Sequence, residues 1–504
     1  MAYAIESEIE GCQLPVFIDG EFSQPRSSTL IDSIDPSYGT PWYQLYDCND
    51  ADIDDAVRAA NTAFNKSEWR NLTPTDRGDL IYRLADLIEQ QADNLAEIET
   101  RDNGKLIKET GAQIRYLKRY YRYYAGIADK LQGDVLPINR EGMLNYTMRE
   151  PLGVVGLIVP WNSPLNTLSV TTAACLAAGN TLVVKPSEHT SASAIAFANL
   201  IKQAGFPDGV FNVVSGYGAT AGDALTRHPG IAKIAFTGGT DTGIKVATNA
   251  AAHIAPCVME LGGKSPHVIF ADADINRAIN GVVAGVFAAA GQTCIAGSRC
   301  FVEQTVYDAV VEQLGVRTRQ VKIGHPKTAE THLGPVATAE QYEKVSAYIQ
   351  YGLDDGARLI AGGKTVTPQG LEGGYYIEPT LFAEADSSMR LFQDEIFGPV
   401  VGVQAFSDEA DLIEKANDTR YGLASGIWTS DIDKAMRFAR DVDAGTVWVN
   451  TYRTAAFMTP MGGFKDSGYG KHNGFDGLRE WTRSKNVMID YSGSTQDPFV
   501  MQIK

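Results

Sequence analysis

Cysteine and histidine are scarce in this sequence and never occur at the spacing of a metal site. Six cysteines, without a C-x-x-C pair, are spread over 504 residues. None of the seven histidines lies in an H-E-x-x-H motif or beside a cysteine at ligand spacing. Such cysteines are expected to be free thiols in a reducing compartment. The sequence therefore predicts neither a disulfide framework nor a bound metal.

The sequence also lacks long apolar runs and an excess of basic charge. No uninterrupted apolar segment approaches the roughly 18 residues that span a bilayer, and acidic side chains stand where a signal peptide is basic and apolar. Acidic residues outnumber basic ones by 61 to 44, which disfavours nucleic acid or an anionic membrane as a partner. We expect a cytoplasmic protein that acts on small molecules.

The length and composition are those of a large folded enzyme. Hydrophobic residues make up 44% and charged residues 21%, and at roughly 150 residues per domain the chain has room for about three domains. Helical periodicity at 52–66 and 74–102, the second behind a Thr73-Pro74 start signal, predicts a mainly helical first quarter. The aromatic and basic segment at 116–126 is interpreted as a packing helix without a chemical role.

From residue 154 onward, short β-rich runs alternate with helical stretches. Such alternation predicts right-handed βαβ units, a parallel sheet with helices on both faces, and ligands at the carboxyl ends of the strands. A second alternating block begins at residue 266 and predicts a second α/β domain. The expected elements are strands at 154–159, 181–184, 210–214, 231–236, 266–270, 300–303, 400–406, 425–428 and 445–450, a helix at 276–290, turns at 352–374 and a late strand at 482–492.

Three residues next to these predicted elements are candidates for catalysis. Oxidation of a carbonyl through a covalent intermediate needs a soft nucleophile, a base and donors for an oxyanion. Cys294 in AAAGQTCIAGSR follows the predicted helix, Glu260 in CVMELGGK ends an apolar run, and Asn162 in IVPWNSP follows a strand. A carboxylate whose pKa is raised by burial can activate water and help to form a thiolate.

Each of these residues also has a purely structural interpretation. Cys294, in its Gly- and Ala-rich setting, is the kind of cysteine that often serves as a small buried hydrophobe. Glu260 can form an ion pair with Lys264, and Asn162 can cap the helix expected to start near Pro164. Taken singly, none of the three residues decides between structure and chemistry.

A glycine-rich turn at 238–243 joins a predicted strand to a helix. Gly238 and Gly239 lie where a pyrophosphate can bind at a helix N-terminus. The full G-x-G-x-x-G fingerprint is absent, so the turn alone is a weak sign of a dinucleotide site.

Together these segments resemble the aldehyde dehydrogenase superfamily, of the NAD(P)-dependent, non-phosphorylating and hydrolytic kind. The motifs lie in the family's order over most of the chain. They are PWN at 160–162, KPSE at 185–188, FTGGT at 236–240, MELGGK at 259–264, GQTC at 291–294, EIFGP at 395–399 and PMGGFKDSG at 460–468.

The resemblance implies an α/β fold with two doubly wound parallel-sheet domains and a small β oligomerisation flap. It places an NAD-binding domain at 1–130 and 152–262, a catalytic domain at 263–466, and the flap at 131–151 and 482–504. A homodimer or homotetramer is expected.

By this resemblance Cys294 is the nucleophile, Glu260 is the base for deacylation, and Asn162 forms the oxyanion hole with the backbone N–H of Cys294. The aldehyde would be oxidised through a cysteine thiohemiacetal and a thioester that water hydrolyses. The implied cofactor contacts are Trp161, Lys185, Glu188, Gly238, Gly239, Glu395 and Phe397. Because the Glu188 carboxylate can accept from a ribose 2′-hydroxyl but repels a 2′-phosphate, NAD is favoured over NADP.

The sequence departs from many family members at two places. Gly239 stands where many have a serine that donates to the pyrophosphate, so cofactor binding must rely on backbone N–H groups and the helix dipole. Many members also have a second glutamate where this chain reads Lys471-His472-Asn473, which leaves Glu260 as the expected base.

The substrate pocket is expected to be roomy and polar. The resemblance places Ser163 and Thr167 on its wall, where bulky apolar residues would build a tight tunnel. Arg453, in NTYRTAAF, would lie near the mouth and hold a distal carboxylate or another polar oxygen, which favours a polar aldehyde or semialdehyde. Its structural interpretation is a solvated loop arginine.

Two other functions compete with hydrolytic aldehyde oxidation. A coenzyme A-dependent acylating enzyme typically lacks the glutamate found here at 260. A catalytically silent, crystallin-like protein would have no need of Cys294, Glu260 and Asn162 together. Both alternatives are therefore less favoured than the dehydrogenase.

Overall fold

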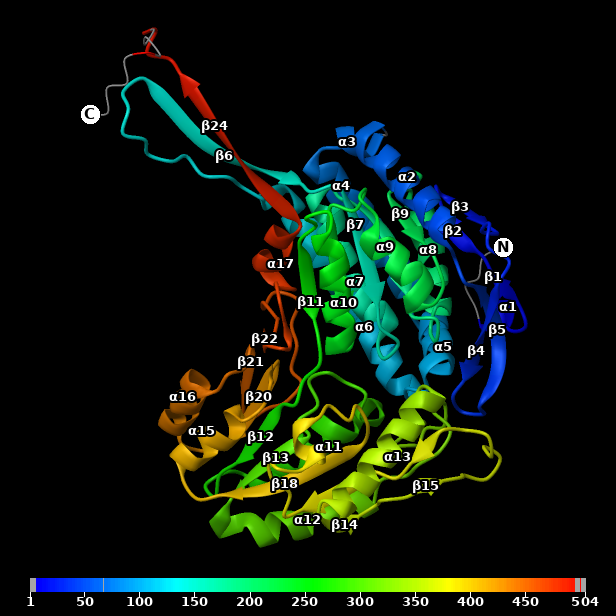
Figure 1. Cartoon of the computed structure of the whole chain (residues 1–504), viewed down its shortest axis with the longest axis vertical. Coiled ribbons are helices and arrows are strands. Elements are labelled where there is room, and N and C mark those ends of the chain that lie inside the picture. The colour runs from blue at the N-terminus through cyan, green and yellow to red at the C-terminus, as the bar shows by residue number, and fades with distance from the viewer. Residues whose placement is uncertain (1–5, 67, 495–498, 500–504) are drawn as a thin grey trace.

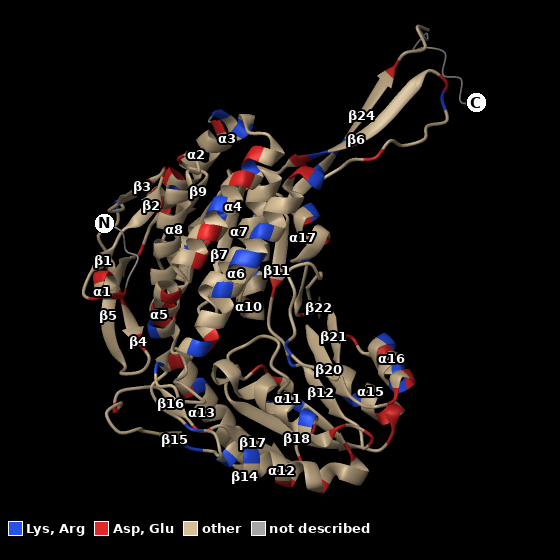
Figure 2. Cartoon of the chain, turned by 180° about the vertical axis from the view of Figure 1, so that it is seen from behind, with Lys and Arg blue, Asp and Glu red and all other residues tan. Residues whose placement is uncertain are grey.

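The computed structural model describes residues 6–66, 68–494 and 499. Two large sheets form the upper and lower parts of the body in Figure 1, and a two-stranded ribbon projects from it. No helix of the described residues is long and apolar enough to cross a membrane. Charged residues are frequent along helices such as α4 (Pro74–Gln90) and α6 (Ile107–Ile127), as Figure 2 shows.

The first sheet has the strand order β23-β11-β10-β7-β8-β9-β2-β3. Its central strands, from β11 to β9, run parallel to their neighbours, whereas β23, β2 and β3 join it antiparallel. The strands are β2 (Val16–Ile18), β3 (Glu21–Ser23), β7 (Val154–Val159), β8 (Thr181–Pro186), β9 (Phe211–Val213), β10 (Lys233–Thr237), β11 (Cys257–Glu260) and β23 (Gly468–Tyr469).

Helices cover both faces of this sheet, which explains why its central strands are almost continuously apolar. Val155 and Leu157 of β7 pack into one core, and Val154 of the same strand packs into another. The covering helices are α2 (Asp50–Lys66), α9 (Asp223–Arg227) and α10 (Thr240–Ala251) on one side, and α7 (Pro164–Ala178) and α8 (Ala192–Ala204) on the other. Helices α4, α5 (Ala92–Asn103) and α6 pack outside α7 and α8.

The second sheet has the order β14-β17-β18-β13-β12-β20-β21 and is parallel apart from its edge strand β14. Its strands are β12 (Pro266–Ile269), β13 (Arg299–Glu303), β14 (Arg358–Ala361), β17 (Thr380–Ala383), β18 (Val400–Phe406), β20 (Ala424–Trp428) and β21 (Thr446–Val449). Its helices are α11 (Ile275–Phe287), α12 (Tyr307–Arg319), α13 (Ala339–Asp354), α14 (Arg390–Gln393), α15 (Glu409–Asn417) and α16 (Ile432–Asp441). The α/β fold predicted from the alternating pattern is confirmed.

The projecting ribbon pairs β6 (Met143–Pro151) with β24 (Thr482–Asp490) in antiparallel register, from Thr482 opposite Pro151 to Asp490 opposite Met143. Its side chains are mostly exposed or half-buried. The short helix α17 (Gly474–Glu480) leads from the first sheet into this ribbon. The late strand predicted at 482–492 is therefore confirmed, although it ends at Asp490.

The sequence-based prediction differs from the structure in three places. The first quarter is helical only from Asp50 onward, because β1 (Gln13–Leu14), β4 (Leu30–Asp35) and β5 (Thr40–Tyr46) form a small sheet before it. The helix predicted at 74–102 is broken at Gln91 into α4 and α5. The glycine-rich segment at 352–374 contains β14 and β15 (Thr365–Val366) as well as turns.

Candidate active site

The carboxyl ends of four neighbouring strands bring most of the predicted site residues to one edge of the first sheet. Ile158 of β7 lies opposite Lys185 of β8 on one side and Phe236 of β10 on the other. Thr237 of β10 lies opposite Glu260 of β11. Because parallel strands end at the same edge, Asn162, Glu188, Gly239 and Glu260 follow side by side.

A strained loop carries Cys294 to this edge from α11. After the helix ends, Ala289 and Ala290 have φ angles of 53° and 52°, a left-handed conformation that costs residues other than glycine about 1 kcal/mol or more. Gly291 follows with φ 75°, and a Cβ there would lie 2.1 Å from the carbonyl oxygen of Gly398. The loop is therefore fixed by packing rather than by backbone preference.

The side chain of Gln292 holds the strained loop in place. Its Oε1 accepts from the backbone N–H of Ala337 at 2.8 Å, and its Nε2 donates to the carbonyl of Ala289 at 3.2 Å. Asn162 Nδ2 donates to the Gln292 carbonyl at 2.8 Å. These bonds fix the chain two residues before Cys294.

The backbone of Cys294 lies against Gly263, the second glycine of the pair that follows Glu260. A Cβ at Gly263 would lie 2.3 Å from the Cys294 carbonyl oxygen, so this approach requires glycine. Burial, and then the nearby carboxylates of Glu395 and Glu260, raise the pKa of the Cys294 thiol to about 12. Cys300 is fully buried within β13, so Cys294 is the more accessible of the two thiols.

Asn162 is not the cap of α7. Ser163 occupies the N-cap position, and its side chain makes no capping hydrogen bond. The capping interpretation of Asn162 is therefore wrong, because its amide donates to the carbonyl of Gln292 in the loop before Cys294. An amide has two N–H groups, so one remains for a ligand.

Glu260 is a buried carboxylate without an ion pair among the described residues. Its Oε1 has no hydrogen-bond partner there, and neither has Lys264 Nζ. Burial raises the pKa of Glu260 to about 8, opposed by Lys471, and lowers the pKa of Lys264 to about 7. The interpretation of Glu260 as the partner of Lys264 is wrong, because the two groups are buried without meeting.

The remaining predicted cofactor residues lie around the same edge. Lys185 Nζ donates to Glu188 Oε2 at 3.2 Å. Burial alone would raise the pKa of Glu188, but the Lys185 ammonium brings it below its ordinary value. Trp161 and Phe397 meet edge to face with ring centroids 5.2 Å apart.

Glu395 approaches Gly262 and Gly263 from the loop before β18 of the second sheet. Its Oε1 accepts from the Gly263 N–H at 3.0 Å, and burial raises its pKa to about 7. A Cβ at Gly262 would lie 2.4 Å from Glu395 Oε2. The two glycines of MELGGK thus admit Glu395 on one side and Cys294 on the other.

The glycine turn after β10 leaves room for a ligand. Gly239 is the N-cap of α10, and a Cβ built there would meet nothing within 4 Å. At Gly238, by contrast, a Cβ would lie 2.5 Å from the Phe236 ring. The open helix N-terminus, with the Glu188 acceptor nearby along the sheet edge, has the donors and acceptors that a dinucleotide requires.

One face of α7 is left partly exposed. Ser163, Asn166, Thr167 and Val170 are half-buried at helical spacing, whereas most other residues of the helix are buried. Sequence analysis found Ser163 and Thr167 but missed Asn166 and Val170, which the same helical spacing would have indicated.

Arg453 is not a solvated loop arginine. It is half-buried with φ 60°, and its Nη1 donates to the Ala284 carbonyl at 3.1 Å. Burial lowers its pKa, and Glu109 and the Cys294 thiol are among the groups that oppose this. The structural interpretation from sequence is therefore wrong, because the guanidinium turns back onto α11.

Sequence analysis missed residues that support the site. Ser467 Oγ donates to the Gly262 carbonyl at 2.6 Å and accepts from the Gly422 N–H at 3.0 Å. Glu109 Oε1 accepts from the Ala289 N–H at 3.0 Å. Ser467 lies in a recognised motif and could have been suspected, but Glu109 is far from every motif in sequence.

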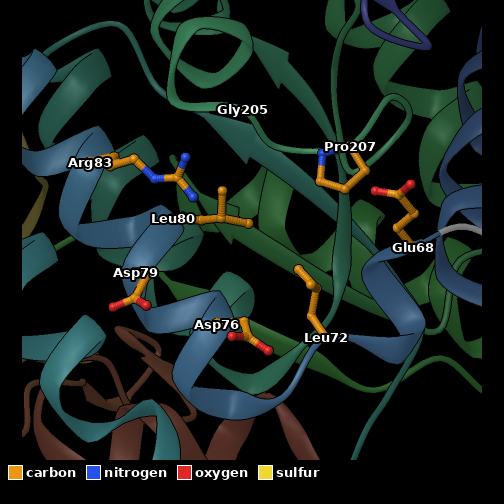
Figure 3. A pocket seen from close by; sticks show the side chains of 8 residues that line it. All are labelled: Glu68, Leu72, Asp76, Asp79, Leu80, Arg83, Gly205 and Pro207. Carbon is orange, nitrogen blue, oxygen red and sulfur yellow. The ribbon is translucent and has the colours of Figure 1, made fainter.

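A separate surface cavity of about 320 Å³ lies between α3 (Glu68–Asn71) and α4 (Figure 3). It is lined by Glu68, Leu72, Asp76, Asp79, Leu80, Arg83, Gly205 and Pro207. None of the predicted site residues lines it, so the cavity is separate from the strand-end site.

Comparison with known proteins identifies the family of this arrangement. The model of the aldehyde dehydrogenase family matches residues 22–487. The chain belongs to the aldehyde dehydrogenase family. Its NAD-dependent reaction, the oxidation of an aldehyde, is the reaction of this chain.

Several characterised relatives share almost the full length of this aldehyde dehydrogenase. A (Z)-2-((N-methylformamido)methylene)-5-hydroxybutyrolactone dehydrogenase of Acinetobacter baylyi is 43% identical, over 97% of this chain and 100% of its own. The betaine aldehyde dehydrogenase of Bacillus subtilis is 40% identical, over 94% of this chain and 96% of its own.

Solved structures agree with the fold. An NAD+ complex of an aldehyde dehydrogenase from Bacillus cereus has a TM-score of 0.92 at 41% identity, covering 95% of this chain and 96% of that one. A betaine aldehyde dehydrogenase from Staphylococcus aureus in complex with NAD+ has a TM-score of 0.95 at 35% identity, covering 97% and 100%.

Proposed function

We propose that this aldehyde dehydrogenase uses Cys294 as nucleophile, Glu260 as base and Asn162 as oxyanion donor to convert a polar aldehyde into its carboxylic acid. The observation that carries this assignment is the buried Glu260 carboxylate, whose Oε1 has no hydrogen-bond partner among the described residues and whose charge raises the pKa of the Cys294 thiol. A base without a competing ion pair is free to take a proton from a thiol or from water.

The first half of the reaction forms a covalent intermediate on Cys294. Its thiol is protonated at neutral pH, so attack on the aldehyde carbon requires proton loss, with Glu260 as acceptor. The carbonyl oxygen becomes an oxyanion, which the Asn162 amide and the Cys294 backbone N–H stabilise. NAD+, when bound, accepts the hydride that leaves as the thiohemiacetal becomes a thioester.

The second half is hydrolysis of the thioester. Glu260 removes a proton from water, the oxygen attacks the acyl carbon, and the carboxylic acid departs as the thiol is restored. A pKa of about 8 puts Glu260 near the range where a base both accepts and returns protons at neutral pH.

For the cofactor, we assign Glu188 and Lys185 to the adenosine ribose, and Gly238 and Gly239 to the pyrophosphate. Trp161, Glu395 and Phe397 are assigned to the nicotinamide end. The support is the open N-terminus of α10 and the ionised Glu188 carboxylate, which favours NAD over NADP.

The proposed substrate pocket lies against the half-buried face of α7. Its polar members Ser163 and Thr167, and Arg453 at the mouth, favour a substrate with a polar group, such as a semialdehyde, over a plain alkanal. The hydroxylated and amide-containing substrate named for the Acinetobacter relative is polar as well.

The predicted domain limits are also part of the proposal. Residues 1–130 and 152–262 would bind NAD, 263–466 would carry the catalytic loop, and 131–151 and 482–504 would form the flap. Within these ranges, residues 1–5, 67, 495–498 and 500–504 fall outside the described residues. Exposed apolar side chains on the ribbon, Leu144, Met148, Met488 and Ile489, support its use in a homodimer or homotetramer of a cytoplasmic enzyme.

An aldehyde panel tests the proposed function. NADH formation should be faster with a polar aldehyde than with an alkanal of equal length, and Arg453→Ala should narrow the gap by raising KM for the polar substrate. Coenzyme A should not accelerate turnover, because water is the acyl acceptor. Equal efficiencies for both aldehydes in the wild type would contradict the substrate class, and dependence on coenzyme A would contradict hydrolysis.

A further inference from the structure

Two oppositely charged side chains, Glu109 and Arg453, hold the turn of chain that leads to Cys294. Glu109, in the first turn of α6, accepts from the Ala289 N–H through Oε1. Arg453 donates from Nη1 to the Ala284 carbonyl. Because Ala284 lies in the last turn of α11 and Ala289 follows that helix, both side chains satisfy backbone groups at its end.

Capping leaves each side chain with unused hydrogen-bonding capacity. Oε2 of Glu109 is buried and has no hydrogen-bond partner in the part of the chain that the structure describes. The Arg453 guanidinium has further N–H groups beyond the one bound to Ala284. A buried acceptor without a hydrogen bond costs free energy. A ligand that donates to Glu109 Oε2 and accepts from the Arg453 guanidinium would therefore be bound favourably.

These two side chains belong to the neighbourhood of the catalytic cysteine. The Arg453 charge interacts with the Cys294 thiol, with Glu109 and with Lys105. Lys105 Nζ in turn donates to Ser163 Oγ at 3.0 Å, at the start of the half-buried face of α7. These couplings and this hydrogen bond connect Glu109 and Arg453 with Cys294 and with the half-buried face of α7.

We propose that Glu109 and Arg453 form the subsite for the distal end of the substrate, and that it selects an uncharged group that both donates and accepts hydrogen bonds, such as a primary amide or an alcohol. An amide can donate to Glu109 Oε2 while its oxygen accepts from Arg453. A carboxylate can only accept hydrogen bonds. It would therefore accept from Arg453, but its other oxygen would face Glu109 Oε2 with no hydrogen bond between the two oxygens.

This inference rests on the proposed function, because it takes Cys294 as the point where the aldehyde reacts. It narrows the polar substrate class to neutral members and so departs from the semialdehyde given there as an example. The charges around the subsite support a neutral substrate, because each cation has an acidic neighbour. Glu109 interacts with Arg453, and Glu99 lies 3.8 Å from the Lys105 ammonium. The cluster therefore has no excess positive charge to attract an anion.

Three aldehydes of matched shape test the selection. They are 4-oxobutanamide, 4-oxobutanoate and 4-methylpentanal, which end in an amide, a carboxylate and an isopropyl group. We expect kcat/KM for the amide to exceed that for each of the others by about tenfold or more, because the other two end groups leave buried polar atoms unpaired. A carboxylate that is oxidised as efficiently as the amide, or more so, overturns the proposal.

The substitution Glu109→Gln tests the residue itself. Glutamine can still accept from the Ala289 N–H, but it places N–H donors where Oε2 stood. The preference should then shift by at least tenfold toward 4-oxobutanoate. Glu97→Gln, on the exposed surface of α5, removes the same charge and should leave the ranking unchanged. An unchanged ranking in Glu109→Gln, with turnover intact, also overturns the proposal.

Propanal separates this proposal from the function on which it rests. It is too short to reach the subsite, so its rate in Glu109→Gln reports on the loop to Cys294, which Glu109 also supports, and not on selection at the distal end. If Glu109→Gln does not oxidise propanal, the substitution has disturbed the loop to Cys294. The order of the three aldehydes in the wild type then decides whether the subsite selects a neutral group. If the wild type oxidises no aldehyde, the proposed function fails, whereas oxidation of propanal with the carboxylate preferred refutes the subsite alone.

Discussion

The carboxyl ends of β8 and β11 each carry a glutamate and a lysine, but only one of the two pairs forms an ion pair. Lys185 Nζ and Glu188 Oε2 lie 3.2 Å apart, whereas Glu260 Oε1 and Lys264 Nζ are buried without a hydrogen-bond partner in the described ranges. The pKa of Glu188 is lowered, and that of Glu260 is raised to about 8. A paired carboxylate remains ionised as a fixed acceptor, while an isolated one can exchange protons.

The largest expected effect comes from removing the thiol beside the unpaired carboxylate. Cys294→Ala should lower aldehyde oxidation by roughly four orders of magnitude or more, because a covalent mechanism loses its nucleophile. NAD binding, which the proposal assigns to the end of β8 with its Lys185–Glu188 ion pair, should persist. NADH formation and cofactor titration measure the two properties. Cys300→Ala is the matched control, and an inactive Cys300→Ala beside an active Cys294→Ala would refute the assignment.

Glu260→Gln should produce the next largest effect, roughly a thousandfold loss of steady-state turnover. Without a carboxylate to deprotonate water, the thioester should accumulate, so rapid mixing should show one equivalent of NADH per site and then a slow phase. A uniformly slow trace with no trapped thioester would contradict the role of Glu260 in deacylation.

The same variant tests the missing ion pair independently of catalysis. The native pKa of about 8 lies above the ordinary 4.5, so the folded state binds the proton more tightly and stability falls as pH rises through this range. Glutamine does not ionise, so the variant avoids the free-energy cost of a buried charge at this position. Denaturant unfolding should show Glu260→Gln more stable than the wild type above pH 8, with the gain shrinking toward pH 5. A constant difference across this range would indicate that Glu260 is paired.

Asn162→Ala should lower kcat by roughly a hundredfold, the scale for losing one oxyanion donor. The residue lies at the end of β7, between the two compared strands, and carries no charge. Its loss should therefore leave the pH profile unchanged. Steady-state kinetics across pH measure both, and a change confined to KM would remove Asn162 from the oxyanion site.

The smallest effect on activity is expected from a substitution in the Lys185–Glu188 ion pair at the end of β8. Glu188→Gln should reduce the preference for NAD over NADP by about tenfold, because the carboxylate that repels a 2′-phosphate is gone. Efficiencies with both cofactors and one aldehyde give the ratio. A wild-type enzyme that prefers NADP would show that Lys185, rather than Glu188, decides the choice.

Local patterns were sufficient to predict most of the fold. The apolar run at 154–159 became β7 with the expected bounds, because a strand covered on both faces must be apolar throughout. The N-terminal strands were missed because their alternation is short and interrupted by polar residues, and β4 draws its burial from packing against distant segments. The break at Gln91 carries neither glycine nor proline, so no sequence signal marked it.

The site was predictable to the level of residues but not of contacts. Motif order located Cys294, Glu260 and Asn162, yet sequence spacing suggested an ion pair at Glu260 that does not form. Side-chain pairing depends on where the backbone turns after a strand, and in MELGGK the glutamate and the lysine are buried without forming an ion pair with each other. The contact of Glu109 with Ala289 joins residues 180 positions apart and has no local signature.

The ribbon of β6 and β24 also has a consequence for the order in which the chain folds during synthesis. Glu150 and Arg483, which face each other in the ribbon, are separated by 333 positions. β6 therefore leaves the ribosome long before its partner exists, and an unpaired strand with exposed Leu144 and Met148 can recruit other edges. Such distant pairing is slow to form. The ribbon is thus expected to close last, and its first strand to be the segment most in need of a chaperone while translation continues.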